Sequence, residues 1–304
     1  MPAYLVRRLL AFVPVLWVVA TAVFLALRLT PGDPAQNLFA EAQLSPEQMA
    51  AQRTALGLDR PLAEQYADYL TRLLRVDFGE SLFTHRPVTL TIAEQSWPTL
   101  ELAAGGMIVA VILGLSLGLG AALRPGTWVG HLAEAAIALS QALPVAWTGL
   151  LGLWLVTATL RIHASLVEFL LLPAMALGFA ACGALAAATR ASVLAVQAER
   201  HVLADRARGF AGWPLLRHTL RVALVPVTHL IALQAAFLFG GTVITETVFA
   251  RPGLGRLLVD SLLRKDLPVV QGLVLFIAAL YLAFNLAADL LAAALDPRLR
   301  SQWQ

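Results

Sequence analysis

The length and composition of the chain exclude most soluble classes of protein. Its 304 residues are 59% hydrophobic and only 13% charged, whereas soluble domains carry about a quarter charged residues. We therefore exclude a soluble two-domain enzyme, a disordered chain and a nucleic-acid binder, and expect a lipid membrane as the main surroundings. Lys265 is the only Lys among 22 basic residues, and it lacks the Gly-rich turn of a P-loop. If the protein uses ATP, a partner must hydrolyse it.

Six stretches are long and apolar enough to cross a membrane, which takes about 20 residues of helix. The predicted spans are 9–29, 100–123, 132–155, 169–188, 225–248 and 269–295. The first resembles a signal peptide in that Arg7 and Arg8 precede an apolar core, but no small-x-small cleavage site follows it. We therefore predict an all-α integral membrane protein with six transmembrane helices, the first of them retained.

The distribution of charge favours a topology with both termini in the cytoplasm (N-in/C-in). The segments that this topology places inside hold eleven Arg residues against three acids, and the outer segment 30–98 holds five Arg against nine acids. Basic residues accumulate on the cytoplasmic side of membrane proteins. The outer loop 250–268 is an exception, because it contains Arg251, Arg256, Arg264 and Lys265.

The outer segment 30–98 is too long to be a simple connector. Ser45 and Pro46 are typical of a helix start, and Gly57 would end that helix. A second helix is expected from Pro61, because apolar residues follow at the spacing of one helix face. These residues are Leu62, Tyr66, Tyr69, Leu70 and Leu73. We predict an extracytoplasmic helical cap on the membrane domain; a second hypothesis is that it also helps to receive a soluble delivery protein.

The inner segment 190–224 is predicted to form a helical hairpin. Gly209 would stop a polar helix, and Gly212 and Pro214 would form a turn before an amphipathic helix that runs into the fifth span. Such a hairpin would project from the membrane as a rigid unit. From its charge alone, it would be a solvated surface near anionic lipid headgroups.

The hairpin also carries a family resemblance. Residues 204–209 and the pattern Arg-His-x-Leu-Arg-x-Ala-Leu-Val-Pro at 217–226 resemble the cytoplasmic coupling loop of permeases from binding-protein-dependent ABC importers of the dipeptide, oligopeptide and nickel type. Further matching patterns follow the whole chain in order. They are Arg-Arg-Leu-Leu at 7–10, Leu-x-Pro-Gly-Asp-Pro at 29–34, Leu-Gly-Leu-Asp-x-Pro-Leu at 56–62, Asp-Phe-Gly-x-Ser at 77–81, Pro-Thr-Leu-Glu-Leu at 98–102, Glu-Thr-Val-Phe-Ala-x-Pro-Gly-Leu-Gly at 246–255 and Asp-Pro-Arg at 296–298.

The resemblance implies a type I ABC importer permease fold and a subunit that is not an enzyme. Two permeases would line one path, and the second is expected to be a different, homologous chain. Two cytoplasmic ATPases would bind ATP and Mg, so this chain would bind no cofactor itself. An extracytoplasmic receptor would deliver the substrate, and the expected location is the cytoplasmic (inner) membrane of a bacterium or archaeon. Dipeptides, longer peptides, glutathione, nickel chelates and oligosaccharides remain open as substrates.

The same resemblance implies which residues contact the ATPase. They are Leu203, Ala204, Asp205, Arg206, Arg208, Gly209 and Phe210. The chain departs from the family pattern at Asp205, where a small residue is usual, and the outer loop 159–168 is shorter than in many members. For Gly209 the alternative to a coupling role is an ordinary helix C-cap.

Five polar residues within the spans are candidates either for the translocation path or for interhelical hydrogen bonds that fix the packing. They are Gln141, Gln234, Glu246, Asn285 and Asp289. The glycines Gly114, Gly118, Gly240 and Gly241 are expected to allow close helix approach. We expect no metal site, because His163, His201, His218 and His229 have no metal-ligand spacing.

Two functions of other classes compete with an importer permease. A stand-alone secondary transporter would require inverted repeats with matched broken helices, and no internal repeat is visible. An intramembrane enzyme would require a catalytic motif within the spans, and none occurs in the sequence. The expected organisation is a first transmembrane helix at 1–29, an extracytoplasmic segment at 30–98, a five-helix core at 99–295 with the coupling loop at 190–224, and a cytoplasmic tail at 296–304.

Overall fold

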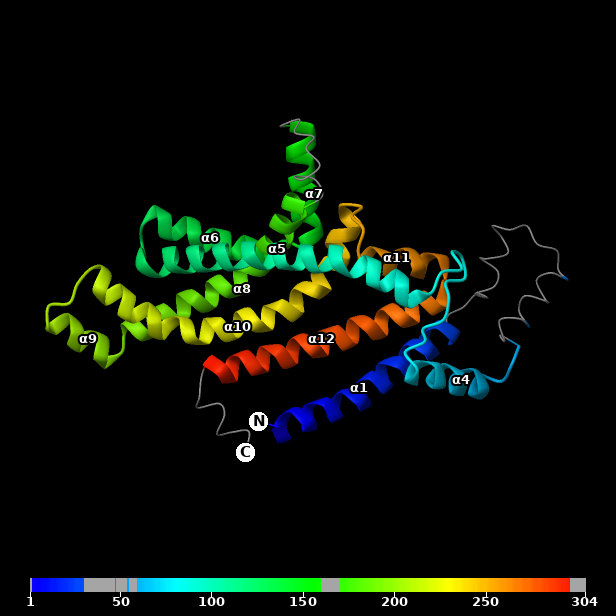
Figure 1. Ribbon diagram of the computed structural model, residues 1–304. Helices are drawn as coiled ribbons and strands as arrows, with labels where there is room; N and C mark the ends of the chain where they lie inside the picture. The colour runs from blue at the N-terminus through cyan, green and yellow to red at the C-terminus, as the bar shows by residue number, and fades with distance from the viewer. Residues whose placement is uncertain (1, 30–46, 48–53, 55–58, 160–169, 296–304) are drawn as a thin grey trace. The chain divides into compact units, whose positions relative to one another are not determined.

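The computed structural model describes residues 2–29, 47, 54, 59–159 and 170–295, and helices dominate them (Figure 1). The helices are α1 (Pro2–Leu29), α4 (Leu62–Leu74), α5 (Val88–Leu123), α6 (Trp128–Ala142), α7 (Val145–Trp154), which continues as a π-helical turn (Leu155–Thr159), α8 (Leu172–Gln197), α9 (Arg200–Ala207), α10 (Trp213–Val248), α11 (Leu254–Arg264) and α12 (Leu267–Leu295). The helix predicted between Ser45 and Gly57, nearly all of the loop 159–168 and the tail 296–304 lie outside the described residues.

Within the described residues, five single helices are long and apolar enough to cross a membrane: Val6–Leu29, Val88–Leu123, Leu172–Gln197, Trp213–Val248 and Leu267–Leu290. The predicted third span, 132–155, is not one straight helix. It is the pair α6 and α7, bent by 111° at a short break, and a sixth span results only if this pair counts as one. The cause is Pro144, which lacks an N–H and disfavours helical geometry at Leu143; Leu143 is extended, with ψ 124°.

Two of the spans are longer than the apolar runs predicted. α5 and α10 each have 36 residues, or about 54 Å at 1.5 Å per residue, and the hydrocarbon core is about 30 Å thick. α5 begins at Val88, before the apolar run at 100–123. The amphipathic helix expected before the fifth span is continuous with it through Pro226, so that α10 joins the hairpin to the membrane segment without a break.

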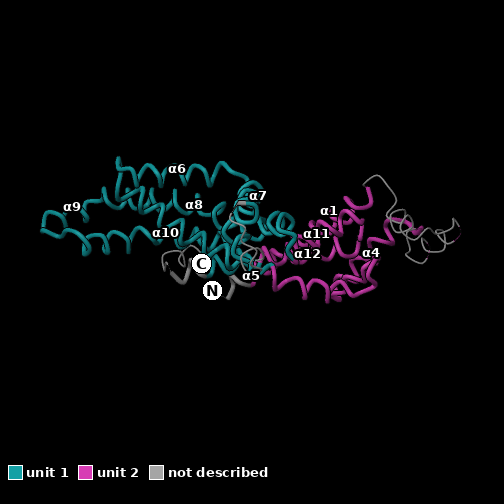
Figure 2. The backbone as a smooth tube through the Cα atoms, turned by 90° about the horizontal axis from the view of Figure 1, so that it is seen from above, with its two compact units in different colours: residues 1–4, 99–251, 283–304 teal, residues 5–98, 252–282 magenta. Residues whose placement is uncertain are grey.

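The chain forms two compact units (Figure 2). Unit 1 comprises Met1–Tyr4, Thr99–Arg251 and Ala283–Gln304, and unit 2 comprises Leu5–Pro98 and Pro252–Leu282. Residues 252–282 thus group with residues 5–98, and residues 283–304 group with residues 99–251.

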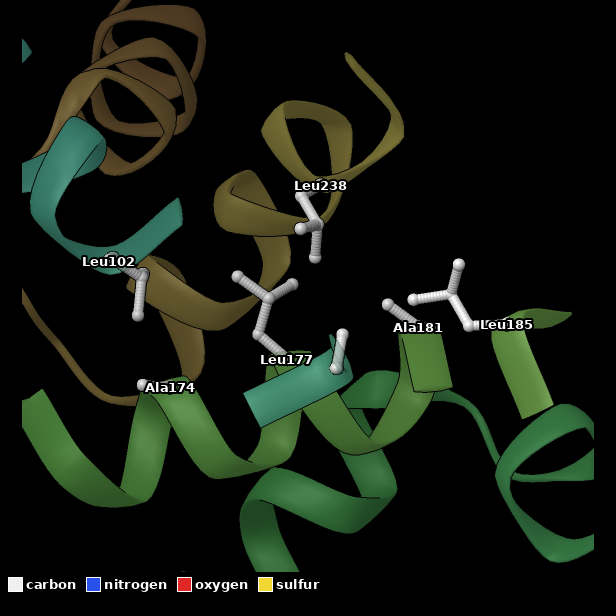
Figure 3. Packing of buried hydrophobic residues seen from close by; sticks show 7 residues of the cluster. Leu102, Ala174, Leu177, Ala181, Leu185 and Leu238 are labelled. Carbon is white, nitrogen blue, oxygen red and sulfur yellow. The ribbon is translucent and has the colours of Figure 1, made fainter. Parts of the chain in front are cut away.

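The core of unit 1 is built around α8, which packs against α6, α7 and α10. Small and aliphatic side chains from α5, α8 and α10 meet in one buried cluster (Figure 3). Its fully or nearly fully buried members are Leu102, Ala110, Ala174, Leu177, Ala181, Leu185 and Leu238. A helix that is apolar on all sides is stable only inside a protein or a membrane, and α8 is the most buried of the spanning helices described.

Glycines allow α5 and α8 to approach closely. A Cβ atom added to Gly118 would lie 2.6 Å from the carbonyl oxygen of Ala186, and one added to Gly114 would lie 2.7 Å from Cβ of Leu185. A Cβ atom on Gly241 would lie 2.7 Å from Leu177. The close approach predicted at these three glycines is confirmed. It is wrong for Gly240, where an added Cβ atom would meet nothing within 4 Å among the described residues.

In unit 2, α4 packs on α1 through two tyrosines. The Tyr66 hydroxyl lies 2.6 Å from Oγ1 of Thr21, and the rings of Tyr66 and Tyr69 lie 5.3 and 5.5 Å from that of Phe24. Burial raises the pKa of Tyr69 to about 12. The predicted apolar face of this helix is therefore observed at its two tyrosines, whereas Leu62 is exposed.

A second contact in unit 2 joins segments far apart in the sequence. Oγ of Ser81 donates to Oδ2 of Asp266 at 2.6 Å, and the backbone N–H of Leu82 donates to Oδ1 at 3.2 Å. Asp266 is buried. Since a buried carboxylate requires such partners, this contact fixes the start of α12 against the short loop that precedes α5.

The glycines give a matched test of helix packing. We expect Gly118→Ala to lower the melting temperature of the detergent-solubilised protein, because overpacking costs about 1–3 kcal/mol. Gly240→Ala should leave it unchanged or raise it, because Ala is favoured over Gly within a helix by roughly 0.5–1 kcal/mol. Tryptophan fluorescence during heating measures both variants, and an equal decrease for the two would contradict the packing described.

Candidate functional site

The most polar part of unit 1 is the α9–α10 hairpin, which we define as residues 199–221. It contains five Arg residues, and α10 continues from it into a membrane span. Charged side chains are costly in hydrocarbon, so the hairpin extends beyond the membrane. Figure 1 shows it at one end of α8 and α10.

Gly209 ends α9 in the way predicted. Its φ is +86°, the left-handed region that glycine enters without steric cost. Its N–H donates to the carbonyl of Arg206, and the N–H of Phe210 donates to that of Asp205, both at 3.0 Å. These two bonds form a Schellman motif, which satisfies the last carbonyls of a helix. Gly212, with φ +66°, then precedes α10.

A buried cluster attaches the hairpin to the helices beneath it. Val202 of α9 is fully buried and packs with Val193 and Val196 of α8 and with Ala223 of α10. Oγ of Ser192 also donates to the Ala223 carbonyl at 2.7 Å. α9 is therefore held on α8 and α10 by side-chain packing as well as by the chain itself.

The hairpin also exposes large apolar side chains. Leu203, Phe210 and Trp213 are 51%, 52% and 69% exposed. Leu203 and Phe210 belong to the residues expected to contact an ATPase, whereas Trp213 does not. The other exposed residues of that set are Ala204, Arg206, Arg208 and Gly209. Apolar groups exposed on a polar segment are typical of protein interaction sites. The arrangement can bind a partner with an apolar pocket and acidic surroundings.

Asp205 lies inside the hairpin. Its carboxylate is 3.8 Å from Nε2 of His218 and 3.9 Å from Nη1 of Arg208, and the His218 ring meets the His201 ring edge-on at 5.8 Å between centroids. His201 in turn lies 3.0 Å from Glu199. The acidic residue that departs from the family pattern is thus accommodated by histidine and arginine side chains of this hairpin. Partly exposed pairs of this kind contribute about 0–1 kcal/mol each.

Two of the polar residues within the spans make hydrogen bonds between helices. Gln234 is buried in α10 and donates to the Ala181 carbonyl of α8 at 3.1 Å. Gln141 of α6 donates to the Gly183 carbonyl of α8 at 3.4 Å. Both contacts favour the packing hypothesis for these side chains.

Glu246 is part of a polar group that the sequence did not predict. It is fully buried in α10 and accepts a hydrogen bond from Thr99 of α5 at 2.7 Å. One turn further, Nη2 of Arg251 bonds to Glu101 at 2.6 Å. The only signal in the sequence was the unusual presence of Arg251 in a loop expected outside. The ion pair with Glu101 balances the charge of Arg251, one of the four basic residues in the loop 250–268. A second of them, Arg256, lies 3.5 Å from Asp260.

Asn285 and Asp289 share one face of α12, as their spacing predicts, and both are partly buried. Of the histidines considered for metal binding, His163 lies outside the described residues. Among the residues that are described, no three His, Cys, Asp or Glu side chains are placed so that they could hold a metal ion.

Comparison with known proteins identifies the family. Residues 110–301 match the family described as binding-protein-dependent transport system inner membrane component, and residues 1–103 match the N-terminal family of the same membrane components. The chain is 38% identical over 302 residues to the glutathione transport system permease protein GsiC of Salmonella typhimurium, and 36% identical over 302 residues to GsiC of Escherichia coli. In both cases the match covers 98% of each protein.

Solved structures agree at the level of the fold. An amino acid ABC transporter crystallised with histidines superposes with a TM-score of 0.58 at 16% identity, over 68% of this chain and 94% of that one. The MetNI methionine ABC transporter in an inward facing conformation gives the same TM-score and identity, over 68% and 97%. The chain belongs to the family of binding-protein-dependent transport system inner membrane components, and it is a permease subunit of an ABC importer and not an enzyme.

Proposed function

We propose that this permease forms half of the translocation path for glutathione or similar small peptides in a bacterial cytoplasmic membrane. The support is the similarity, over 98% of each chain, to permeases named for glutathione transport. An importer of this family depends on an ATPase and a substrate-binding protein. The remaining half of the path would be a different, homologous permease, and two ATPase subunits would bind ATP and Mg.

The α9–α10 hairpin is, in this proposal, the surface that docks on one of the ATPases. The observation that carries it is that the hairpin has both a buried and an exposed apolar side. Val202 of α9 is buried against α8 and α10, whereas Leu203 of α9 and Phe210, which follows the helix, are exposed. An ATPase that encloses the exposed face and moves would displace α8 and α10 with it, because the buried face is packed on both helices. The exposed Arg206 and Arg208 suit acidic groups around such a pocket.

Purification of the assembled importer tests the composition. A tag on this chain should recover the companion permease, two ATPase subunits per complex and, with substrate, the binding protein. Proteoliposomes with this complex should accumulate labelled glutathione only when ATP and the binding protein are both supplied. A single subunit that transports alone would contradict the proposal and favour a secondary transporter.

Gly209 provides a test of coupling with a matched control. Gly209→Val places a branched side chain at positive φ, which costs roughly 1–2 kcal/mol or more, and no described residue lies within 4 Å of the position of its Cβ atom. We expect severalfold lower uptake, with ATP hydrolysis retained and no longer stimulated by the loaded binding protein.

Gly126→Val is the control, because Gly126 also has a positive φ of +74° and, among the described residues, no neighbour within 4 Å of an added Cβ atom. It lies in the turn between α5 and α6, outside the α9–α10 hairpin. Gly209→Asn should retain the coupling that Gly209→Val loses, since Asn tolerates the left-handed conformation. Equal losses in Gly209→Val and Gly126→Val would contradict a specific role for the hairpin.

A further inference from the structure

A polar group lies at the end of unit 1 where α10 stops. Thr99 and Glu101 come from α5, and Glu246 and Arg251 come from the last turn of α10 and the residues after it. The hairpin lies at the other end of α10, about 54 Å away along the helix. These polar residues therefore belong to the opposite end of the path from the proposed ATPase contact.

The backbone holds Arg251 in a fixed position. Its N–H donates to the Glu246 carbonyl at 2.9 Å, which closes a Schellman motif at the end of α10. Ala250 makes that motif with φ +50°, a conformation that alanine adopts only when the surrounding structure imposes it. The Glu246 side chain bonds to Thr99, so that the same turn is tied to α5.

The guanidinium of Arg251 is buried but only partly paired. The residue is 5% exposed. Nη2 is bonded to Oε2 of Glu101, whereas Nη1 is buried without a hydrogen-bond partner among the described residues. A buried unpaired donor is unfavourable, and more so when it is charged. Native proteins retain such groups where another function requires them.

Glu101 is a displaceable partner. Its side chain is 43% exposed, so its carboxylate can turn into water with little loss of hydration. Arginine presents parallel N–H donors that match a carboxylate in a bidentate geometry. Here Glu101 uses Nη2 alone, and a carboxylate that replaced it could accept from Nη1 and Nη2 together.

We propose that Arg251 determines specificity in this permease by binding a carboxylate of the transported peptide in place of Glu101. Nη1 and Nη2 are the donors, and Glu101 is the resting partner that occupies the site when no substrate is present. The inference rests on the proposed function, because it takes a small peptide with a free carboxylate as the substrate. It assigns to this chain a selection step in addition to that of the binding protein.

Substitutions of Arg251 and of Glu101 should change glutathione uptake in opposite directions. We expect Arg251→Gln to lower glutathione uptake about tenfold, the loss of one charged hydrogen bond, and Arg251→Lys to lower it less. Glu101→Gln should raise uptake severalfold, because it removes the competing carboxylate. The measurement is the initial rate in proteoliposomes with the whole importer, at limiting glutathione-loaded binding protein.

A purely structural ion pair predicts a different result. Each variant breaks the same contact between α5 and the residues after α10, so Arg251→Gln and Glu101→Gln would both lower uptake. That outcome overturns this inference and leaves the proposed function intact. Absence of uptake of glutathione and of other small peptides by the wild-type importer would overturn the proposed function, and the inference with it. The melting temperature and subunit ratio of each complex identify any variant that fails to fold. If Arg251→Gln fails to fold, uptake by the Arg251→Lys complex is compared with that of the wild type instead.

Discussion

The backbones of α5 and α8 approach so closely in unit 1 that a single methyl group at Gly118 does not fit between them. This approach brings the small side chains of α8 into contact with α5, and it leaves room on other sides of α8 for α6, α7 and α10. Without a hydrophobic force between helices inside lipid, close packing of small residues is a main source of attraction. The positions of the hairpin and of Arg251 both depend on it, because each is held by α10, which packs on α8.

α10 connects the two regions to which we assign function. Its first turns form the hairpin with α9, and its last turn carries Glu246 and leads to Arg251. A continuous helix transmits displacement along its length, and the interhelical bond from Gln234 to α8 lies between the two ends. The hairpin and the polar group are therefore connected through one continuous helix.

Most of the helices could be predicted from the sequence, because a run of about 20 apolar residues in a membrane must satisfy its backbone hydrogen bonds internally, as a helix does. The end of α9 was also predictable, since Gly209 is a local signal. The break at Pro144 was missed because the apolar run continues through it. Hydropathy measures composition and is insensitive to one residue that lacks a backbone donor.

The sequence by itself determined the membrane class, the helical hairpin and, through ordered motifs along the chain, the family. Tertiary structure alone decided which polar residues meet. Glu101 and Arg251 lie 150 positions apart, and Ser81 and Asp266 lie 185 apart. Helix periodicity relates residues only within a few turns, so no local pattern specifies such pairs. They depend on how the helices pack, and that depends on the summed fit of many small side chains.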